Sequence, residues 1–161
     1  MGTYRVAQIC WNGHCITDSA NANPELCADF CRKCGAKTTT YCPLCKEYIR
    51  GEYYVPEVLL LGARKFRAPA YCHKCGAAYP WTQASLDAAK TLILEDENTT
   101  QEEQNKLIEV LPALLVDSPN SQLAESRLKR FLSKAGPFIA EGIRDIIVGI
   151  AAETIKKSMG L

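Results

Sequence analysis

Residues 30–45 read FCRKCGAKTTTYCPLC and contain two Cys-x-x-Cys pairs separated by seven residues. A Cys-x-x-Cys turn directs two sulfurs to one side of a tight bend, so each pair supplies half of a tetrahedral zinc site. The whole chain holds four half-sites, which are Cys10/His14, Cys31/Cys34, Cys42/Cys45 and Cys72/Cys75. Four half-sites predict two zinc ions per chain.

Pairing the half-sites in chain order gives two sets of four ligands. Site 1 then consists of Cys10, His14, Cys31 and Cys34, and site 2 of Cys42, Cys45, Cys72 and Cys75. The alternative closes the two inner half-sites on one ion and leaves the two outer ones to meet each other. Site 2 has the stronger signal, because two Cys-x-x-Cys pairs at this spacing are typical of structural zinc.

The fourth ligand of site 1 has three candidates. We expect His14, but Cys15 follows it directly and Cys27 lies four residues before Cys31, so either cysteine could replace the histidine. Otherwise Cys15 and Cys27 would act as small hydrophobic residues.

Composition places the chain among globular proteins, with 161 residues, 47% hydrophobic content and 23% charge. Residues 1–84 carry 10 basic and 6 acidic side chains, net +4, whereas residues 85–161 carry 9 and 12, net −3. These balances predict no strong attraction to nucleic acid or membranes from net charge alone.

All nine cysteines lie between Cys10 and Cys75, and the first residues show no secretory pattern. The cysteines are odd in number and confined to one part of the chain, which argues against a disulfide framework. We therefore expect a reducing, cytoplasmic location. The best candidate for a membrane span, residues 138–155, is interrupted by charged residues and is not expected to cross a bilayer.

The predicted fold class is α+β. Strand-like runs at residues 4–9, 36–41 and 53–61 alternate with the half-sites, which predicts a double zinc ribbon of short antiparallel strands over residues 1–81. Gly35 and Gly76 follow the second cysteine of their pairs, where such a turn needs a positive φ.

From residue 82 the hydrophobic period becomes helical, which predicts a bundle of three to four helices over residues 82–161. Thr82 is expected to cap the first helix, and Thr99 or Thr100 to open the second with a capping box. Pro112 should end or kink that helix. We further expect an inward face on the third helix, made of Leu123, Leu128, Phe131 and Leu132.

Gly136 is expected to cap the third helix and Pro137 to begin the last one, which extends through Ile155. Gly142 and Gly149 form a smooth strip on that helix. The strip suits close approach of another helix, so we expect the helical region to be a docking or oligomerisation unit, with a homo-oligomer as one outcome.

Four motifs together resemble an uncharacterised family of bacterial double zinc-ribbon proteins with a C-terminal helical region. The motifs are IC-x-NGH from residue 9, FC-x-KCGAKT from residue 30, CP-x-C with IRG from residue 42, and PAYCHKCG-x-x-YPWT from residue 69. Residues 117–136 are also similar to the helical region of that family. The resemblance implies two zinc sites and a helical tail, and no activity; Cys15 and Cys27 depart from its pattern.

The sequence favours a non-enzymatic adaptor that binds a protein partner of unknown identity. It contains no Gly-rich phosphate loop or Ser-His-Asp set. The alternative is nucleic-acid binding through the basic loop Arg64, Lys65, Phe66 and Arg67. Cations beside an aromatic ring suit phosphate contact with base stacking.

Overall fold

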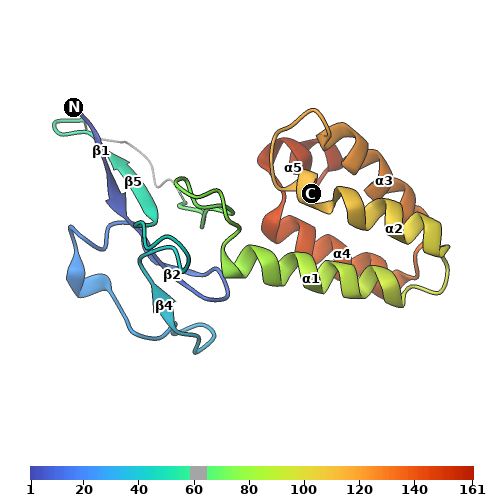
Figure 1. Ribbon diagram of the computed structural model, residues 1–161, viewed down its shortest axis with the longest axis horizontal. Coiled ribbons are helices and arrows are strands. Elements are labelled where there is room, and N and C mark those ends of the chain that lie inside the picture. The colour runs from blue at the N-terminus through green and yellow to red at the C-terminus, as the bar shows by residue number, and fades with distance from the viewer. Residues whose placement is uncertain (59–64) are drawn as a thin grey trace. The chain divides into compact units, whose positions relative to one another are not determined.

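The computed structural model describes residues 1–58 and 65–161. The chain divides into two compact units, Met1–Gln83 and Ala84–Leu161. The first contains short antiparallel strands and the second contains helices (Figure 1), which confirms the α+β class.

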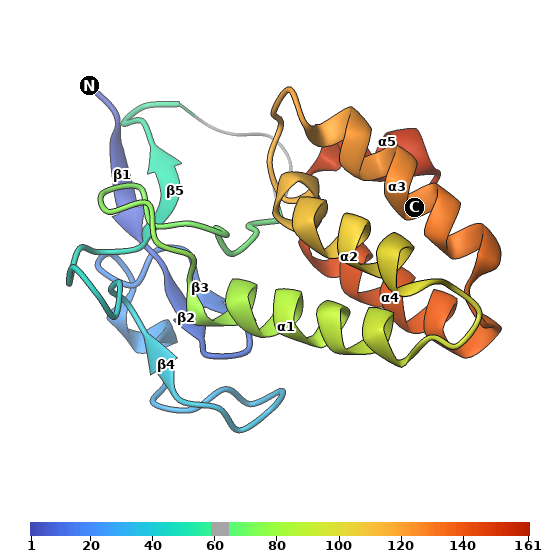
Figure 2. The ribbon, with the colours of Figure 1, turned by 45° about the vertical axis from the view of Figure 1, so that its right-hand side comes forward.

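Five short strands are present among the described residues of the first unit. They are β1 (Thr3–Val6), β2 (Gln8–Cys10), β3 (Cys15–Thr17), β4 (Thr38–Thr39) and β5 (Arg50–Tyr54). β1 pairs antiparallel with β5, and Tyr4 lies opposite Tyr53. The other sheet has the order β3-β2-β4 and is also antiparallel (Figure 2).

The strands are shorter than the sequence patterns predict. The run at residues 4–9 is divided between two sheets at Ala7, whose amide donates to the carbonyl of Ile49 (2.9 Å). The run at residues 36–41 keeps only β4, because the metal-site turns on either side use the remaining backbone groups. The strand predicted at residues 53–61 begins and ends earlier in the chain: β5 is Arg50–Tyr54, and residues 59–61 lie outside the described part of the chain.

The core of the first unit is built from residues that surround site 2. Its buried members are Ala7, Ile9, Cys42, Ile49, Cys72, Tyr79 and Trp81. The rings of Tyr79 and Trp81 stack with centroids 4.6 Å apart. Gly51 in β5 lies against the chain at Asp18, where an added Cβ would come within 2.0 Å of the carbonyl oxygen. This core is small, and ligand cysteines are part of it.

Five α-helices follow in the described residues, one more than the upper count predicted. They are α1 (Pro80–Glu95), α2 (Gln101–Val110), α3 (Ser121–Lys134), α4 (Pro137–Ile150) and α5 (Glu153–Met159), with 3-10 turns at Pro24–Leu26 and Leu111–Leu114. The extra helix arises because the last predicted helix breaks at Ala151 and Ala152. Both residues are extended there, and the amide of Ala152 donates to the carbonyl of Leu114 (2.9 Å).

Three of the predicted helix boundaries are confirmed. Thr100 caps α2 in a capping box with Glu103. That helix ends at Val110, just before Pro112, and Pro137 stands in the first turn of α4.

Three other predictions for the helices are wrong. Thr82 lies inside α1, which begins at Pro80, and its hydroxyl donates to the carbonyl of Ala70 (2.8 Å). Gly136 precedes α4 with φ −57°, so it is not a left-handed cap of α3. Leu123 is 46% exposed, because the buried face of α3 is formed by Ser121, Ala124, Leu128 and Phe131.

A buried carboxylate fastens the loop between α1 and α2 to the start of α4. Asp96 accepts hydrogen bonds from the hydroxyl of Thr99 (2.7 Å) and the amide of Gly136 (2.9 Å). Gln104 donates to the carbonyl of Asp96 (2.7 Å). Burial opposes ionisation of Asp96, but these hydrogen bonds hold its pKa below the ordinary value.

The glycine strip of α4 is partly used inside the unit. A Cβ at Gly142 would lie 3.1 Å from the side chain of Leu92 in α1, whereas a Cβ at Gly149 would meet no described atom within 4 Å. Gly142 therefore serves packing of the chain on itself.

Candidate metal sites

The three Cys-x-x-Cys turns share one backbone geometry. In each turn the amide of the first cysteine donates to the carbonyl five residues later, at 2.7–2.8 Å; the pairs are Cys31 with Ala36, Cys42 with Glu47, and Cys72 with Ala77. The residue after the second cysteine has a positive φ, and its amide donates back to the carbonyl of the first cysteine. A bridge between the flanking residues closes every turn. The same local fold thus presents each pair of sulfurs.

Lys46 occupies the position that Gly35 and Gly76 occupy in the other two turns. Its φ is 61°, close to the 71° of both glycines. A side chain with Cβ is disfavoured in this conformation. The turn therefore imposes its geometry on Lys46, whose ammonium group lies 5.5 Å from the centre of the Tyr41 ring.

The first half-site is a hairpin loop between β2 and β3. The amide of Gly13 donates to the carbonyl of Cys10 (2.8 Å), and the amide of Cys10 donates to the carbonyl of His14 (2.9 Å). Gly13 has φ 85°, and a Cβ there would lie 3.1 Å from the side chain of Trp81. The loop brings the Cys10 sulfur and the imidazole of His14 together.

The structure gathers the four ligand atoms of site 1, which lie within 4.8 Å of one another. His14 Nδ1 is 3.3 Å from Cys34 Sγ, 3.5 Å from Cys10 Sγ and 3.7 Å from Cys31 Sγ. Cys10 Sγ is 3.7 Å from Cys34 Sγ. His14 is thus placed like a fourth ligand, with Nδ1 facing the three sulfurs.

Neither of the other two cysteines joins a ligand cluster of the described residues. Cys15 is half-buried against the core of the first unit, and burial raises its pKa to about 11. Cys27 is exposed, and its sulfur is 4.0 Å from the carbonyl of Ala20. Both act as side chains outside the sites.

Site 2 brings together the four remaining cysteines, again within 4.8 Å. Cys42 Sγ is 3.8 Å from Cys75 Sγ, and Cys45 Sγ is 3.6 Å from Cys72 Sγ. In both sites the first cysteine of each turn is buried and the second is more exposed. The half-sites are therefore grouped in chain order, and the inner pairs do not close on each other.

The spacing of the ligand atoms fits a tetrahedral ion. For zinc–sulfur bonds of ~2.3 Å, the edge of a regular tetrahedron is ~3.8 Å, and an edge from sulfur to a nitrogen at ~2.0 Å is ~3.5 Å. The sulfur pairs lie at 3.6–3.8 Å and the nitrogen–sulfur pairs at 3.3–3.7 Å. The two clusters can each hold a metal ion.

The electrostatics of site 1 favour one thiolate and oppose another. The amide of Ala36 and the side chain of Asn12 hydrogen bond to Cys34 and lower its pKa to about 6. Burial raises the pKa of Cys10, although the amides of His14 and Asn12 donate to its sulfur. A cation would offset the repulsion between these sulfurs.

Site 2 shows the same division between its cysteines. Burial opposes ionisation of Cys72, but the amides of Cys75 and Lys74 donate to its sulfur and lower its pKa to about 6. The amide of Glu47 favours the thiolate of Cys45, yet burial and the neighbouring sulfurs raise its pKa to about 11. A positive ion among the four sulfurs would stabilise their thiolate forms at this spacing.

Two residues that support the ligands were not predicted from the sequence. Asn12 reaches Cys34 with its side chain, and the hydroxyl of the buried Tyr79 hydrogen bonds to the sulfur of Cys72. Asn12 could have been predicted, because it lies between the ligands Cys10 and His14 in the sequence. The role of Tyr79 depends on how α1 starts, which residue spacing does not reveal.

The residues of the basic loop are only partly described. Arg64 lies outside the described residues, while Lys65 and Arg67 are exposed. Phe66 is half-buried and packs against the core of the first unit. Its ring is thus engaged in packing on one side, and nucleic-acid binding by this loop stays a prediction.

The strands and the two Cys/His clusters define a protein with zinc-ribbon-like sites followed by a helical region. The chain belongs to the family described as uncharacterized protein conserved in bacteria (DUF2321), which matches residues 3–159. This match confirms the resemblance inferred from the four motifs. No curated protein and no solved structure matches the chain. None of the helices formed by the described residues is long and apolar enough to cross a membrane.

Proposed function

We propose that this protein is a non-enzymatic, cytoplasmic zinc-binding adaptor with two structural zinc ions per chain. The observation that carries the proposal is that each cluster offers four protein ligands at tetrahedral spacing. Zinc sites of this kind fill all four positions with protein atoms, whereas catalytic zinc keeps one position for water or substrate. The ions would hold the turns in place rather than take part in a reaction.

Thiolate chemistry also favours zinc as the ion. Cysteine sulfur and imidazole nitrogen are the ligands of structural zinc, and hard cations such as Mg²⁺ prefer oxygen. The first unit has a small core that includes ligand cysteines such as Cys42 and Cys72. In a unit of this size, metal binding supplies much of the folding free energy.

The turns carry exposed aromatic side chains that suit a protein partner. Phe30 is 56% exposed, Tyr41 45% and Tyr48 60%. Bridges between the turn-flanking residues hold these rings on a fixed backbone, including Tyr41 opposite Tyr48. Aromatic residues are enriched in protein interfaces, and rigid presentation lowers the entropy cost of binding. The helical residues 82–161 would serve as the docking or oligomerisation unit of the adaptor.

Native mass spectrometry of the tagged protein recovered from bacterial cells tests the proposal. We expect two zinc ions per chain and a protein partner in defined stoichiometry. Replacing Phe30 and Tyr48 by serine should remove the partner while both ions remain. Recovery of the chain without any protein partner, or zinc-dependent turnover of a substrate, would contradict the adaptor.

A further inference from the structure

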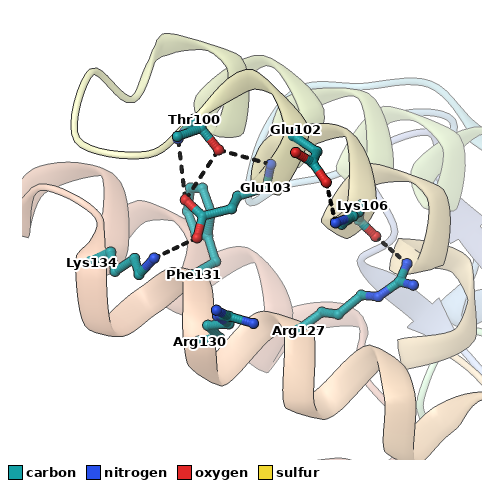
Figure 3. A pocket seen from close by; sticks show the side chains of 8 residues that line it. All are labelled: Thr100, Glu102, Glu103, Lys106, Arg127, Arg130, Phe131 and Lys134. Carbon is teal, nitrogen blue, oxygen red and sulfur yellow. Dashed lines mark hydrogen bonds and ion pairs between the residues drawn. The ribbon is translucent and has the colours of Figure 1, made fainter.

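The helical unit contains a basic pocket between α2 and α3, shown in Figure 3. Its volume is about 390 Å³. This is within the ordinary range of ligand pockets. Its charged lining consists of the cations Lys106, Arg127, Arg130 and Lys134 and the carboxylates Glu102 and Glu103. We name it the α2/α3 groove.

Most charges of the groove are already paired within the chain. Glu103 belongs to the capping box and also receives the ammonium group of Lys134, and Glu102 pairs with Lys106. Arg127 donates to the carbonyl of Lys106 (2.6 Å) and approaches Glu109 at 3.5 Å. Both carboxylates of the lining are thereby occupied.

Arg130 is the exception among these cations. It is exposed on α3, and its guanidinium group makes no ion pair or side-chain hydrogen bond to any residue in the described part of the chain. In Figure 3 it lies between Arg127 and Lys134, with Phe131 beside it. A guanidinium group offers a planar pair of donors that matches a carboxylate.

We propose that the α2/α3 groove binds an acidic peptide segment of the protein partner, with Arg130 holding a carboxylate of that segment. This inference rests on the proposed adaptor function and names the chemistry of its partner. The aliphatic stems of Lys106 and Arg127 supply apolar walls for the neighbouring side chains of the segment.

The surrounding charge favours a peptide over a nucleic acid. The residues of the helical unit carry 9 basic and 12 acidic side chains, net −3, which repels a continuous polyanion. Isolated carboxylates between apolar residues avoid this penalty, since only the groups that reach Arg130 need to be charged.

Fluorescence anisotropy with the full zinc-loaded chain tests the proposal. The probe is a fluorescein-labelled peptide with a single glutamate between leucine residues, and the matched probe has glutamine in place of that glutamate. We expect saturable binding of the glutamate peptide and no saturable binding of the glutamine peptide. Arg130→Glu should weaken it at least about tenfold, because a charge-assisted bidentate pair is lost.

Arg144→Glu is the matched control, because Arg144 is an exposed arginine on α4 that does not line the groove. It makes the same change in net charge and should alter the affinity less than about twofold if local contact dominates. Arg130→Lys keeps the positive charge but loses the paired donors of the guanidinium group. Its affinity for the glutamate peptide should lie between those of wild type and Arg130→Glu. Circular dichroism should be unchanged in all three variants.

The proposal is overturned if the glutamate peptide does not bind saturably, or if Arg144→Glu weakens it as much as Arg130→Glu. Tighter, Arg130-dependent binding of a single-stranded oligothymidine would also overturn it in favour of nucleic acid. Capture from cells separates the two proposals. A partner retained equally by Arg130→Glu leaves the adaptor standing and refutes the groove, whereas peptide binding without any captured partner supports the groove and refutes the adaptor.

Discussion

Replacing His14 by alanine should remove one zinc ion and leave the other. His14 Nδ1 lies 3.3–3.7 Å from three sulfurs, so its loss opens one corner of the tetrahedron. Structural zinc contributes roughly 10–16 kcal/mol over four ligands. An even division gives about 3–4 kcal/mol for one ligand, which weakens the affinity of site 1 by roughly 10²- to 10³-fold.

The measurement is zinc content after dialysis against chelators of increasing strength. At intermediate strength, wild type should retain two equivalents and His14→Ala about one. Cys15→Ser and Cys27→Ser are the controls, and both should retain two even if Cys15→Ser lowers stability through its contact with the core. His14→Cys should restore the second equivalent, because a fourth sulfur can complete the site.

Two equivalents in His14→Ala, combined with loss of one in Cys15→Ser or Cys27→Ser, would refute this reasoning. The fourth ligand would then be a cysteine, and the imidazole would merely lie near the sulfurs.

Three further predictions concern the surroundings of the sites and the stability of each unit. Tyr79→Phe removes a hydroxyl that supports a site 2 sulfur, so zinc affinity measured by chelator competition should fall about 10- to 100-fold, while the exposed Tyr48→Phe should leave it unchanged. Gly51→Ala places a Cβ 2.0 Å from a backbone oxygen, so chemical denaturation should show a free energy of unfolding lower by about 3 kcal/mol. Gly149→Ala adds a Cβ that meets open space in a helix and should raise the free energy of unfolding by about 0.5–1 kcal/mol. Asp96 has a lowered pKa in the folded chain. Its contribution to the free energy of unfolding is therefore complete above its unfolded pKa of about 4 and is lost as the pH falls through the folded pKa. Denaturation of wild type and Asp96→Asn at pH 7 and pH 3 should therefore show a larger difference at pH 7.

Local patterns were enough to predict the ligand turns and several helix boundaries. A Cys-x-x-Cys turn is determined within eight residues by its own hydrogen bonds, and the sulfurs can face only one side. The capping box at Thr100 and the prolines at 112 and 137 act through the backbone beside them. Such features need no information from distant parts of the chain.

The features that were missed depend on contacts between distant residues. The break at Ala151 and Ala152 follows Gly149, which stays inside α4, and it is stabilised by the hydrogen bond from the Ala152 amide to the distant carbonyl of Leu114. Threonine is a common helix cap, but the hydroxyl of Thr82 donates instead to the carbonyl of Ala70. Phe66 stands between cations like a stacking residue, yet it packs against a core that only the folded chain creates.

The half-sites are grouped in chain order, which has a consequence for synthesis on the ribosome. Every ligand of site 1 lies within residues 10–34, and every ligand of site 2 lies within residues 42–75. A growing chain emerges from its N-terminus, so it exposes the complete first set before any ligand of the second. The first ion can be captured while the second set is still being made, and a nascent chain that has bound it has fewer thiolates left to bind the wrong partner.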